Sequence, residues 1–239
     1  MKIGIIPARY ASTRFPGKPL ALIYGKPMIQ HVYERASEAS LDKVVVATDD
    51  MRIHDAVINF GGEVVLTKPT HPSGTDRCGE VAAKLQLSDE DIIVNIQGDE
   101  PFIRKEEINT LISLFKTPEV EIATLIKPIT QPEEIENPNK VKVVVSKQKR
   151  ALYFSRFPIP YRRGDAETSY FKHIGIYAYR QKTLQKIVQL PTTTLENCEK
   201  LEQLRWLEND ISIYTAECYH ESIAIDTPED LQQIPNIKE

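Results

Sequence analysis

The sequence lacks an apolar run of the roughly 20 residues that a membrane-spanning helix requires. It also shows no secretion signal, because the short apolar run after Met1 is followed directly by Pro7 and Arg9. Both absences argue against a membrane or secreted protein. We therefore expect a cytoplasmic protein that has no membrane partner.

Cysteine is scarce, and the three residues of this type are widely separated: Cys78, Cys198 and Cys218. An odd number of distant thiols fits neither a disulfide framework nor a zinc site, so we expect them to be reduced. Positive charge is not in excess either, since the formal net charge is -4 at pH 7. A nucleic-acid-binding face would usually make the chain basic, and we expect no nucleic-acid partner.

Several common motifs are missing. No Gly-x-Gly-x-x-Gly follows the first predicted strand, and no Gly-x-x-x-x-Gly-Lys-Ser/Thr occurs, which excludes the dinucleotide fingerprint and the standard phosphate loop of NTPases. A Gly-x-Ser-x-Gly elbow is absent, and the five histidines do not have metalloprotease spacing. Hydrolase and dehydrogenase chemistry of these standard types is therefore disfavoured.

What is present is an alternation of apolar runs with amphipathic segments. Strands are expected at 3–6, 43–47, 63–66, 91–96 and 121–127, with helices between them that include 50–59 and 76–87. This rhythm predicts an α/β fold with a mostly parallel sheet and helices on its faces.

The second half departs from strict alternation. A hairpin is expected at 141–145 and 151–154, and a strand at 172–179 with His173, Gly175, Tyr177 and Tyr179 on one side. A helix at 196–207 and a short strand at 223–225 follow. No linker long enough to separate independent domains is present, so we expect a single domain over residues 1–239.

The loop after the first strand is cationic. Between Met1 and Tyr33 the chain carries Lys2, Arg9, Arg14, Lys18 and Lys26 but no acidic side chain. Guanidinium and ammonium groups on a loop of small residues are typical of polyphosphate binding, so we expect a nucleoside triphosphate here. The alternative is an ordinary solvated basic surface.

Two aspartates follow short apolar strands, at Asp99 and Asp226. Ligands collect at the carboxyl ends of strands in open α/β sheets, and Mg²⁺ takes one or two carboxylates together with water and phosphate oxygens. We expect a magnesium site made by both. The alternatives are a helix N-cap for Asp226 and a turn residue for Asp99, and for Asp49 and Asp50 the N-cap interpretation is preferred.

Nine segments match, in the same order along the chain, the motifs of one protein family. They are Ile6–Leu20, Val46–Asp49, His71–Arg77, Asn95–Pro101, Asn137–Val143, Ala151–Arg156, His173–Tyr177, Leu201–Arg205 and Ile225–Asp230. Together they resemble the sugar-acid cytidylyltransferases. The Ser-Gly-Thr-Asp-Arg, Tyr-Phe-Ser-Arg and Glu-Gln-Leu-Arg segments favour the branch that uses 3-deoxy-manno-octulosonate (Kdo).

The resemblance implies a Rossmann-like nucleotide-diphospho-sugar transferase fold with a smaller antiparallel extension. Residues 1–130 would mainly bind nucleotide, and residues 131–239 would mainly bind sugar and form a homodimer. The implied reaction transfers CMP from CTP to the anomeric 2-hydroxyl of Kdo, with Mg²⁺, for lipopolysaccharide synthesis.

The resemblance also assigns site residues by position. Catalytic roles are implied for Arg9, Lys18, Asp99 and Asp226, of which the two aspartates would hold the metal. CTP contacts are implied for Pro7, Ala8, Arg9, Ser12, Arg14, Lys18, Thr48, Ser73, Thr75, Arg77 and Gln97. Kdo contacts are implied for Gln97, Arg156, His173, Tyr177, Glu202 and Gln203.

Residues 157–172 do not align with a family pattern, so their contacts stay open. Two other functions also stay open. One is nucleotidyl transfer to a sialic-acid-like sugar or to an amino analogue of Kdo, and the other is a catalytically silent nucleotide-binding or assembly protein.

Overall fold

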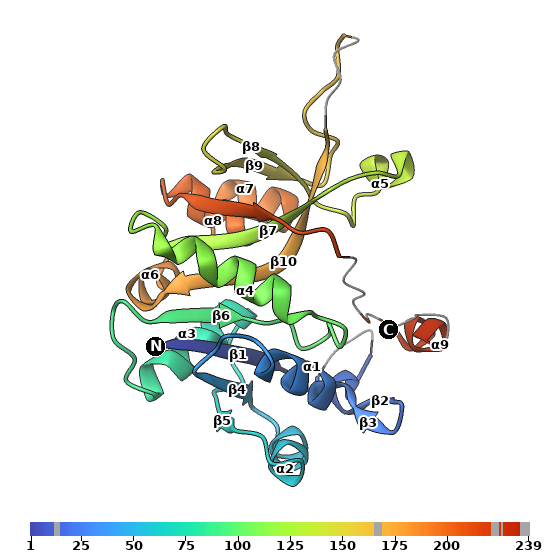
Figure 1. Ribbon diagram of the computed structural model, residues 1–239, viewed down its shortest axis with the longest axis vertical. Coiled ribbons are helices and arrows are strands. Elements are labelled where there is room, and N and C mark those ends of the chain that lie inside the picture. The colour runs from blue at the N-terminus through green and yellow to red at the C-terminus, as the bar shows by residue number, and fades with distance from the viewer. Residues whose placement is uncertain (12–14, 165–168, 221–224, 226, 235–239) are drawn as a thin grey trace. The chain divides into compact units, whose positions relative to one another are not determined.

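A computed structural model of the protein describes residues 1–11, 15–164, 169–220, 225 and 227–234. The chain forms two compact units (Figure 1). Unit 1 contains Met1–Asn109 and Glu221–Glu239, and unit 2 contains Thr110–His220. The units therefore divide earlier than the expected functional boundary near residue 130, and the end of the chain belongs with its beginning. The expectation of a single domain stays a prediction.

The sheet of unit 1 is parallel and has the strand order β6-β1-β4-β5. Its strands are β1 (Lys2–Ala8), β4 (Lys43–Thr48), β5 (Val64–Leu66) and β6 (Ile92–Asn95). The apolar runs of β1, β4 and β6 are buried, as expected for parallel strands covered on both sides, whereas the edge strand β5 is partly exposed. The register places Ala8 beside Thr48, so β1 and β4 end together. The four predicted strands are confirmed.

Helices and short elements complete this unit, and several pack on the sheet (Figure 1). They are η1 (Lys18–Leu20), β2 (Leu22–Ile23), β3 (Lys26–Pro27), α1 (Met28–Ser37), α2 (Met51–Asn59), α3 (Gly74–Lys84) and α9 (Pro228–Gln233), with α4 (Lys105–Ser113) at the division between the units. Helix α3 starts two residues before the expected position, because the side chain of Ser73 accepts a hydrogen bond from the backbone of Asp76 and caps it.

Unit 2 mixes strand directions. Its elements are η2 (Leu114–Lys116), β7 (Ile122–Pro128), α5 (Pro132–Glu136), β8 (Lys142–Val145), β9 (Ala151–Ser155), β10 (Phe171–Arg180), α6 (Gln181–Ile187), α7 (Thr194–Glu199), α8 (Gln203–Glu208) and β11 (Ile213–Glu217). Strand β11 is parallel to β7, whereas the β7–β10, β10–β8 and β8–β9 pairs are antiparallel. The predicted hairpin and the α/β class with an antiparallel extension are confirmed.

The prediction of a single helix at 196–207 is wrong. The structure has two helices there, because Lys200 takes a left-handed conformation with φ of 54° between α7 and α8. The two helices are joined by Arg205, whose Nη2 and Nε lie 2.5 and 2.8 Å from the two carboxylate oxygens of Glu196.

Strand β10 contains an irregularity that the sequence did not reveal. Its pairing with β7 shifts by two residues between Ile174 and Tyr177. Because side chains alternate with period two, a shift of two keeps His173, Tyr177 and Tyr179 on one side, as predicted. Ring contacts of 5.2 Å between His173 and Tyr177 and of 6.0 Å between Tyr177 and Tyr179 confirm this.

The strand expected at 223–225 falls mostly outside the described residues. Within the described ranges, no helix combines the length and the apolar character that crossing a bilayer would take.

Candidate functional site

In unit 1 the predicted nucleotide residues gather where β1, β4 and β6 end. Two close backbone approaches define this place. A Cβ atom on Gly98 would lie 2.9 Å from the carbonyl oxygen of Pro7, and one on Gly74 would lie 3.1 Å from Cγ of Pro7. The loop after β6 and the start of α3 therefore both lie against Pro7, which brings the backbone next to Ser73 and Gln97 close to the end of β1.

Lys18 and Asp99 form an ion pair at this edge of the sheet. The ammonium nitrogen of Lys18 lies 2.7 Å from Oδ2 of Asp99, and both side chains are partly buried. Lys18 is positioned by Gly17, which has φ of 73° and whose N–H donates to the carbonyl of Tyr10 at 2.9 Å. The sequence predicted both residues for the site but did not predict that they bind each other.

The surroundings of Asp99 fit a magnesium ion. Its side chain is 31% exposed, and among the described residues only Lys18 bonds its carboxylate. The backbone N–H of Ile225 donates to the carbonyl of Asp99 at 2.9 Å, which brings the chain segment just before Asp226 to the same place. One or two carboxylates are enough for Mg²⁺, because this ion fills its other positions with water and phosphate oxygens.

Asp226 itself lies outside the described residues, so its predicted role is not tested. The alternative interpretation, an N-cap for α9, is wrong, because Thr227 holds that position and forms a capping box with Asp230. Within the described ranges no cluster of three or more His, Cys, Asp or Glu side chains could hold a metal.

The cationic loop is only partly described. Ser12 and Arg14 lie outside the described residues. Arg9 is exposed at the end of β1, as a phosphate-binding side chain should be. The guanidinium of Arg52 stacks at 3.3 Å from the ring centroid of Tyr10 and also pairs with Asp50 at 2.6 Å, so α2 supports this loop.

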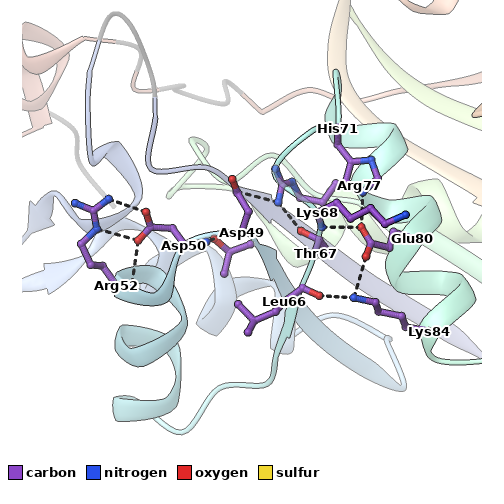
Figure 2. A network of polar contacts seen from close by, with 11 residues as sticks. Asp49, Asp50, Arg52, Leu66, Thr67, Lys68, His71, Arg77, Glu80 and Lys84 are labelled. Carbon is purple, nitrogen blue, oxygen red and sulfur yellow. Dashed lines mark hydrogen bonds and ion pairs between the residues drawn. The ribbon is translucent and has the colours of Figure 1, made fainter.

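Arg77 is placed differently from the expectation of a direct nucleotide contact. Figure 2 shows its guanidinium directed at Asp49 and Thr67, and it is only 1% exposed. Its Nη1 lies 3.0 Å from Oδ1 of Asp49 and donates to the hydroxyl of Thr67. Burial lowers the pKa of Arg77, and the charge of Asp49 counteracts this. Arg77 thus ties the ends of β4 and β5 together, and its contact with a nucleotide stays a prediction.

Asp49 and Asp50 were both expected to be N-caps, but in the structure the two residues have different roles. Asp50 caps α2 by accepting from the backbone N–H of Arg52 at 2.9 Å, as predicted. Asp49 instead faces Arg77, so the capping interpretation is wrong for it. The difference arises because a short carboxylate reaches the helix N–H groups only from the N-cap position.

The remaining nucleotide residues use their side chains locally. Thr48 is buried and its hydroxyl accepts from the backbone N–H of Asp50 at 3.2 Å. Thr75 is buried, and the hydroxyl of Ser73 donates to Asp76 at 2.5 Å. Gln97 lies in the loop after β6, where its carbonyl accepts from the backbone of Glu100 at 3.3 Å. Their contacts with CTP stay predictions.

A second network in Figure 2 holds the loop before α3. The carboxylate of Glu80 accepts from the backbone N–H of Lys68 at 2.9 Å, pairs with Lys84 at 2.8 Å and contacts His71. Burial alone raises the pKa of Glu80, but hydrogen bonds from Lys84, His71 and Lys68 outweigh it and lower the pKa to about 2. The path of the chain into Ser73 is thereby fixed.

In unit 2, four of the predicted sugar residues lie around one aromatic cluster. His173 contacts Phe154 and Tyr177 with ring centroids 5.1 and 5.2 Å apart, and Tyr177 packs edge-on against Trp206 at 5.0 Å. Burial lowers the pKa of His173 to about 3, so the imidazole is neutral. Burial also raises the pKa of Tyr177, as does the charge of Glu202.

Two polar groups of this cluster are buried and keep hydrogen-bonding capacity. They are Nε2 of Gln203, which is on α8 with Trp206, and the hydroxyl of Tyr177, whose side chain interacts with Thr124. Buried polar groups are normally bonded, so unused groups in one place indicate a site for a polar ligand.

Arg156 was expected to bind the carboxylate of Kdo, and its guanidinium already has protein partners. It donates to the carbonyls of Glu199 at 2.7 Å, Pro138 at 3.0 Å and Lys200 at 3.4 Å. Its backbone N–H also donates to Glu199 at 2.9 Å. Within this structure Arg156 joins three loop segments, and its sugar contact stays a prediction.

Sequence reasoning missed three residues that organise these places. Thr124 bonds to His173, Asp49 pairs with Arg77, and Lys142 is fully buried with its ammonium donating to the carbonyl of Asn137 at 2.8 Å. The available signal was a single polar residue inside an otherwise apolar strand, as in Ile122–Ile126, where a hydroxyl needs a specific partner.

Comparison with known proteins shows extensive similarity. A family model described as Cytidylyltransferase matches residues 3–217. The 3-deoxy-manno-octulosonate cytidylyltransferase of Parabacteroides distasonis is 54% identical, over 97% of this chain and 95% of its own length. A protein of the same name from Fusobacterium nucleatum is 50% identical, over 99% and 97%.

Solved structures agree. A CMP:2-keto-3-deoxy-manno-octonic acid synthetase complexed with CTP superposes with a TM-score of 0.93 at 47% identity, covering 98% of this chain and 97% of the other. The 4-diphosphocytidyl-2C-methyl-D-erythritol synthase of Anaerococcus prevotii has a TM-score of 0.61 at 12% identity, covering 96% and 94%. This more distant likeness concerns the fold alone.

Proposed function

This chain belongs to the cytidylyltransferase family and is a nucleotidyltransferase, and from that premise we propose that it transfers CMP from CTP to Kdo, giving CMP-Kdo and pyrophosphate. The observation that carries the proposal is the Lys18–Asp99 pair at the end of β6. It sets a cation suited to phosphate oxygens beside a carboxylate suited to a metal ion, which is the combination that nucleotidyl transfer needs.

The proposed chemistry is an in-line displacement. The anomeric 2-hydroxyl of Kdo forms a bond to the α-phosphorus, the bond from that phosphorus to pyrophosphate breaks, and the proton of the hydroxyl passes to water. Catalysis consists mainly of positioning and of neutralising charge. Arg9 and Lys18 bind the phosphate oxygens of the leaving group, together with Ser12 and Arg14.

Asp99 and Asp226 are the residues that would hold Mg²⁺. When bound, the ion supplies Lewis-acid stabilisation of the charge on the phosphate oxygens. The support for this assignment is the exposed carboxylate of Asp99 and the backbone bond from Ile225, which precedes Asp226. Lys18 keeps the Asp99 carboxylate oriented before the substrate arrives.

The polar groups around the aromatic cluster suit a polyhydroxylated sugar acid. The hydroxyl of Tyr177 and the amide of Gln203 have unused hydrogen-bonding capacity, and the carboxylate of Glu202 accepts from sugar hydroxyls in the proposal. Arg156 supplies positive charge for the carboxylate of Kdo.

The proposal extends to the setting of the reaction. It takes place in the cytoplasm, where CTP is made, and its product is used for lipopolysaccharide synthesis. A homodimer is proposed as well, supported by large apolar side chains that are exposed on unit 2, namely Leu152, Phe157 and Tyr161. Sedimentation equilibrium gives the mass that checks this assembly.

The decisive experiment measures pyrophosphate release from CTP, Kdo and Mg²⁺, with each component omitted in turn. Release should require all three. Asp99→Asn should lower kcat by about 100-fold or more, because a group that neutralises transition-state charge is lost. The matched control is Asp89→Asn, an exposed aspartate before the amino end of the same strand, which should retain activity.

Two outcomes would contradict the proposal. A strong preference for a sialic-acid-like sugar or an amino analogue over Kdo would overturn the acceptor. Full activity of Asp99→Asn, or turnover without a divalent metal, would overturn the assigned site.

A further inference from the structure

Thr124 is the only threonine of β7 and it is completely buried in unit 2. Its Oγ1 lies 2.8 Å from the carbonyl oxygen of Ile176, 3.2 Å from that of Ile174 and 3.0 Å from Nε2 of His173. One hydroxyl therefore has two carbonyls and one imidazole nitrogen within hydrogen-bonding distance, and the side chain of Tyr177 is a further neighbour that can donate to its oxygen.

The two carbonyls reach Thr124 because of the irregularity in β10. The pairing shift places two extra residues between Ile174 and Tyr177, opposite Leu125 and Thr124. Such an insertion interrupts the ladder and leaves main-chain groups without strand partners. The hydroxyl of Thr124 lies within hydrogen-bonding distance of the carbonyls of Ile174 and Ile176, at this insertion.

The position of the hydroxyl proton follows from these distances. Carbonyl oxygens are acceptors only, so the Thr124 proton must point toward Ile176 or Ile174, or two acceptors would face each other at 2.8 Å. The oxygen of Thr124 then accepts, and Nε2 of His173 has to be the donor. Because burial keeps the imidazole neutral, Nδ1 carries no proton.

We propose that Thr124 is a positioning residue that fixes His173 as the Nε2–H tautomer and leaves Nδ1 as an acceptor for a hydroxyl of the sugar. Nδ1 has no hydrogen-bond partner among the described residues, and the ring is held between Phe154 and Tyr177. The identity of the ligand rests on the proposed function, whereas the tautomer does not.

The tautomer is read directly by NMR of protein labelled with ¹⁵N-histidine, without substrates. Five histidines give signals, and His173→Gln identifies the one of interest. At about pH 7 this signal should show a protonated Nε2 and an unprotonated Nδ1. Thr124→Val removes the hydroxyl at constant shape, and it should replace this pattern by a mixture of tautomers, whereas Thr124→Ser should keep it.

A matched control is available in the adjacent strand. Thr215 is the register partner of Thr124 in β11, is equally buried, and donates to the carbonyl of Lys149 at 2.9 Å. Thr215→Val removes a buried hydroxyl of the same kind without touching the imidazole. It should leave the His173 signal unchanged even if it lowers the melting temperature.

Kinetics test the role of the fixed tautomer. Thr124→Val should raise KM for Kdo in inverse proportion to the fraction of the Nε2–H tautomer that its spectrum still shows, and leave KM for CTP unchanged. Thr124→Ser should restore KM for Kdo. Equal increases in both KM values, or an increase that Thr215→Val reproduces, would overturn the positioning role.

The wild-type spectrum decides the proposal even if Thr124→Val does not fold. A protonated Nδ1, or an imidazolium at neutral pH, would refute it. If the spectrum is as expected but wild-type protein releases no pyrophosphate with Kdo, the proposed function fails and the assignment of the tautomer stands.

Discussion

Removal of the Asp49 carboxylate should destabilise the protein more than removal of the Arg77 guanidinium, although the first change breaks one contact of this pair and the second also breaks the bond to Thr67. Arg77 is 1% exposed and Asp49 is 22% exposed. Asp49→Ala leaves a buried cation whose remaining described partner is the hydroxyl of Thr67. Arg77→Met keeps the volume of the side chain and leaves a carboxylate that is 22% exposed, although its Oδ1, which faced Arg77, is buried.

The magnitudes follow from the burial. Loss of one partner of a fully buried ion pair costs about 3–5 kcal/mol, and the partial exposure of Asp49 reduces this to about 2–3 kcal/mol for Asp49→Ala. For Arg77→Met we expect about 1 kcal/mol, because the partly exposed carboxylate of Asp49 keeps part of its hydration. In a protein of this size 1 kcal/mol shifts the melting temperature by about 2–4 °C.

Thermal unfolding followed by circular dichroism at pH 7 measures the difference. Asp49→Ala should lower the melting temperature by about 4–12 °C and Arg77→Met by about 2–4 °C. The double variant should resemble Arg77→Met, since no buried cation remains. Asp89→Ala, at an exposed position, is the control. An equal or larger loss for Arg77→Met would refute the reasoning.

Two further predictions concern unit 1. The low pKa of Glu80 means that its contacts stabilise the protein above about pH 4.5 and that this contribution disappears as the pH falls toward about 2. Glu80→Gln should therefore cost about 1 kcal/mol at pH 7, after allowance for solvent screening, and a melting difference from wild type that did not shrink between about pH 5 and 3 would contradict this. Gly98→Ala should cost about 1–3 kcal/mol in urea unfolding, because its Cβ would lie 2.9 Å from the backbone oxygen of Pro7. Gly164→Ala, where the added Cβ would meet no atom within 4 Å among the described residues beyond its chain neighbours, is the matched control, and an equal effect there would exclude the steric explanation.

Local patterns made the elements of the fold predictable. Apolar runs identified β1, β4 and β6, and their parallel arrangement predicted that Pro7 and Asp99 lie at one edge of the sheet. The patterns did not show where a single residue would interrupt an element. The run 196–207 has helical spacing throughout, yet Lys200 breaks it.

Side-chain partners were the least predictable part of the candidate site. Motif positions assigned Arg77 and Arg156 to ligands, whereas in the structure both guanidinium groups have protein acceptors. No sequence pattern indicates that a particular carbonyl lies near a particular arginine, because such contacts join segments far apart in the chain. The two-residue shift in β10 escaped detection for a different reason: it preserves the alternation that reveals a strand.

Unit 1 contains residues from both ends of the described chain, and this affects the order in which the two units can fold during synthesis. A cluster of buried side chains in this unit joins Ile23 and Met28 to Ile225 and Ile234. During synthesis the ribosome completes all of unit 2 before these last two residues exist. Unit 1 therefore keeps an open apolar surface until Ile225 and Ile234 have been synthesised, whereas unit 2, which is continuous in sequence, is synthesised before them.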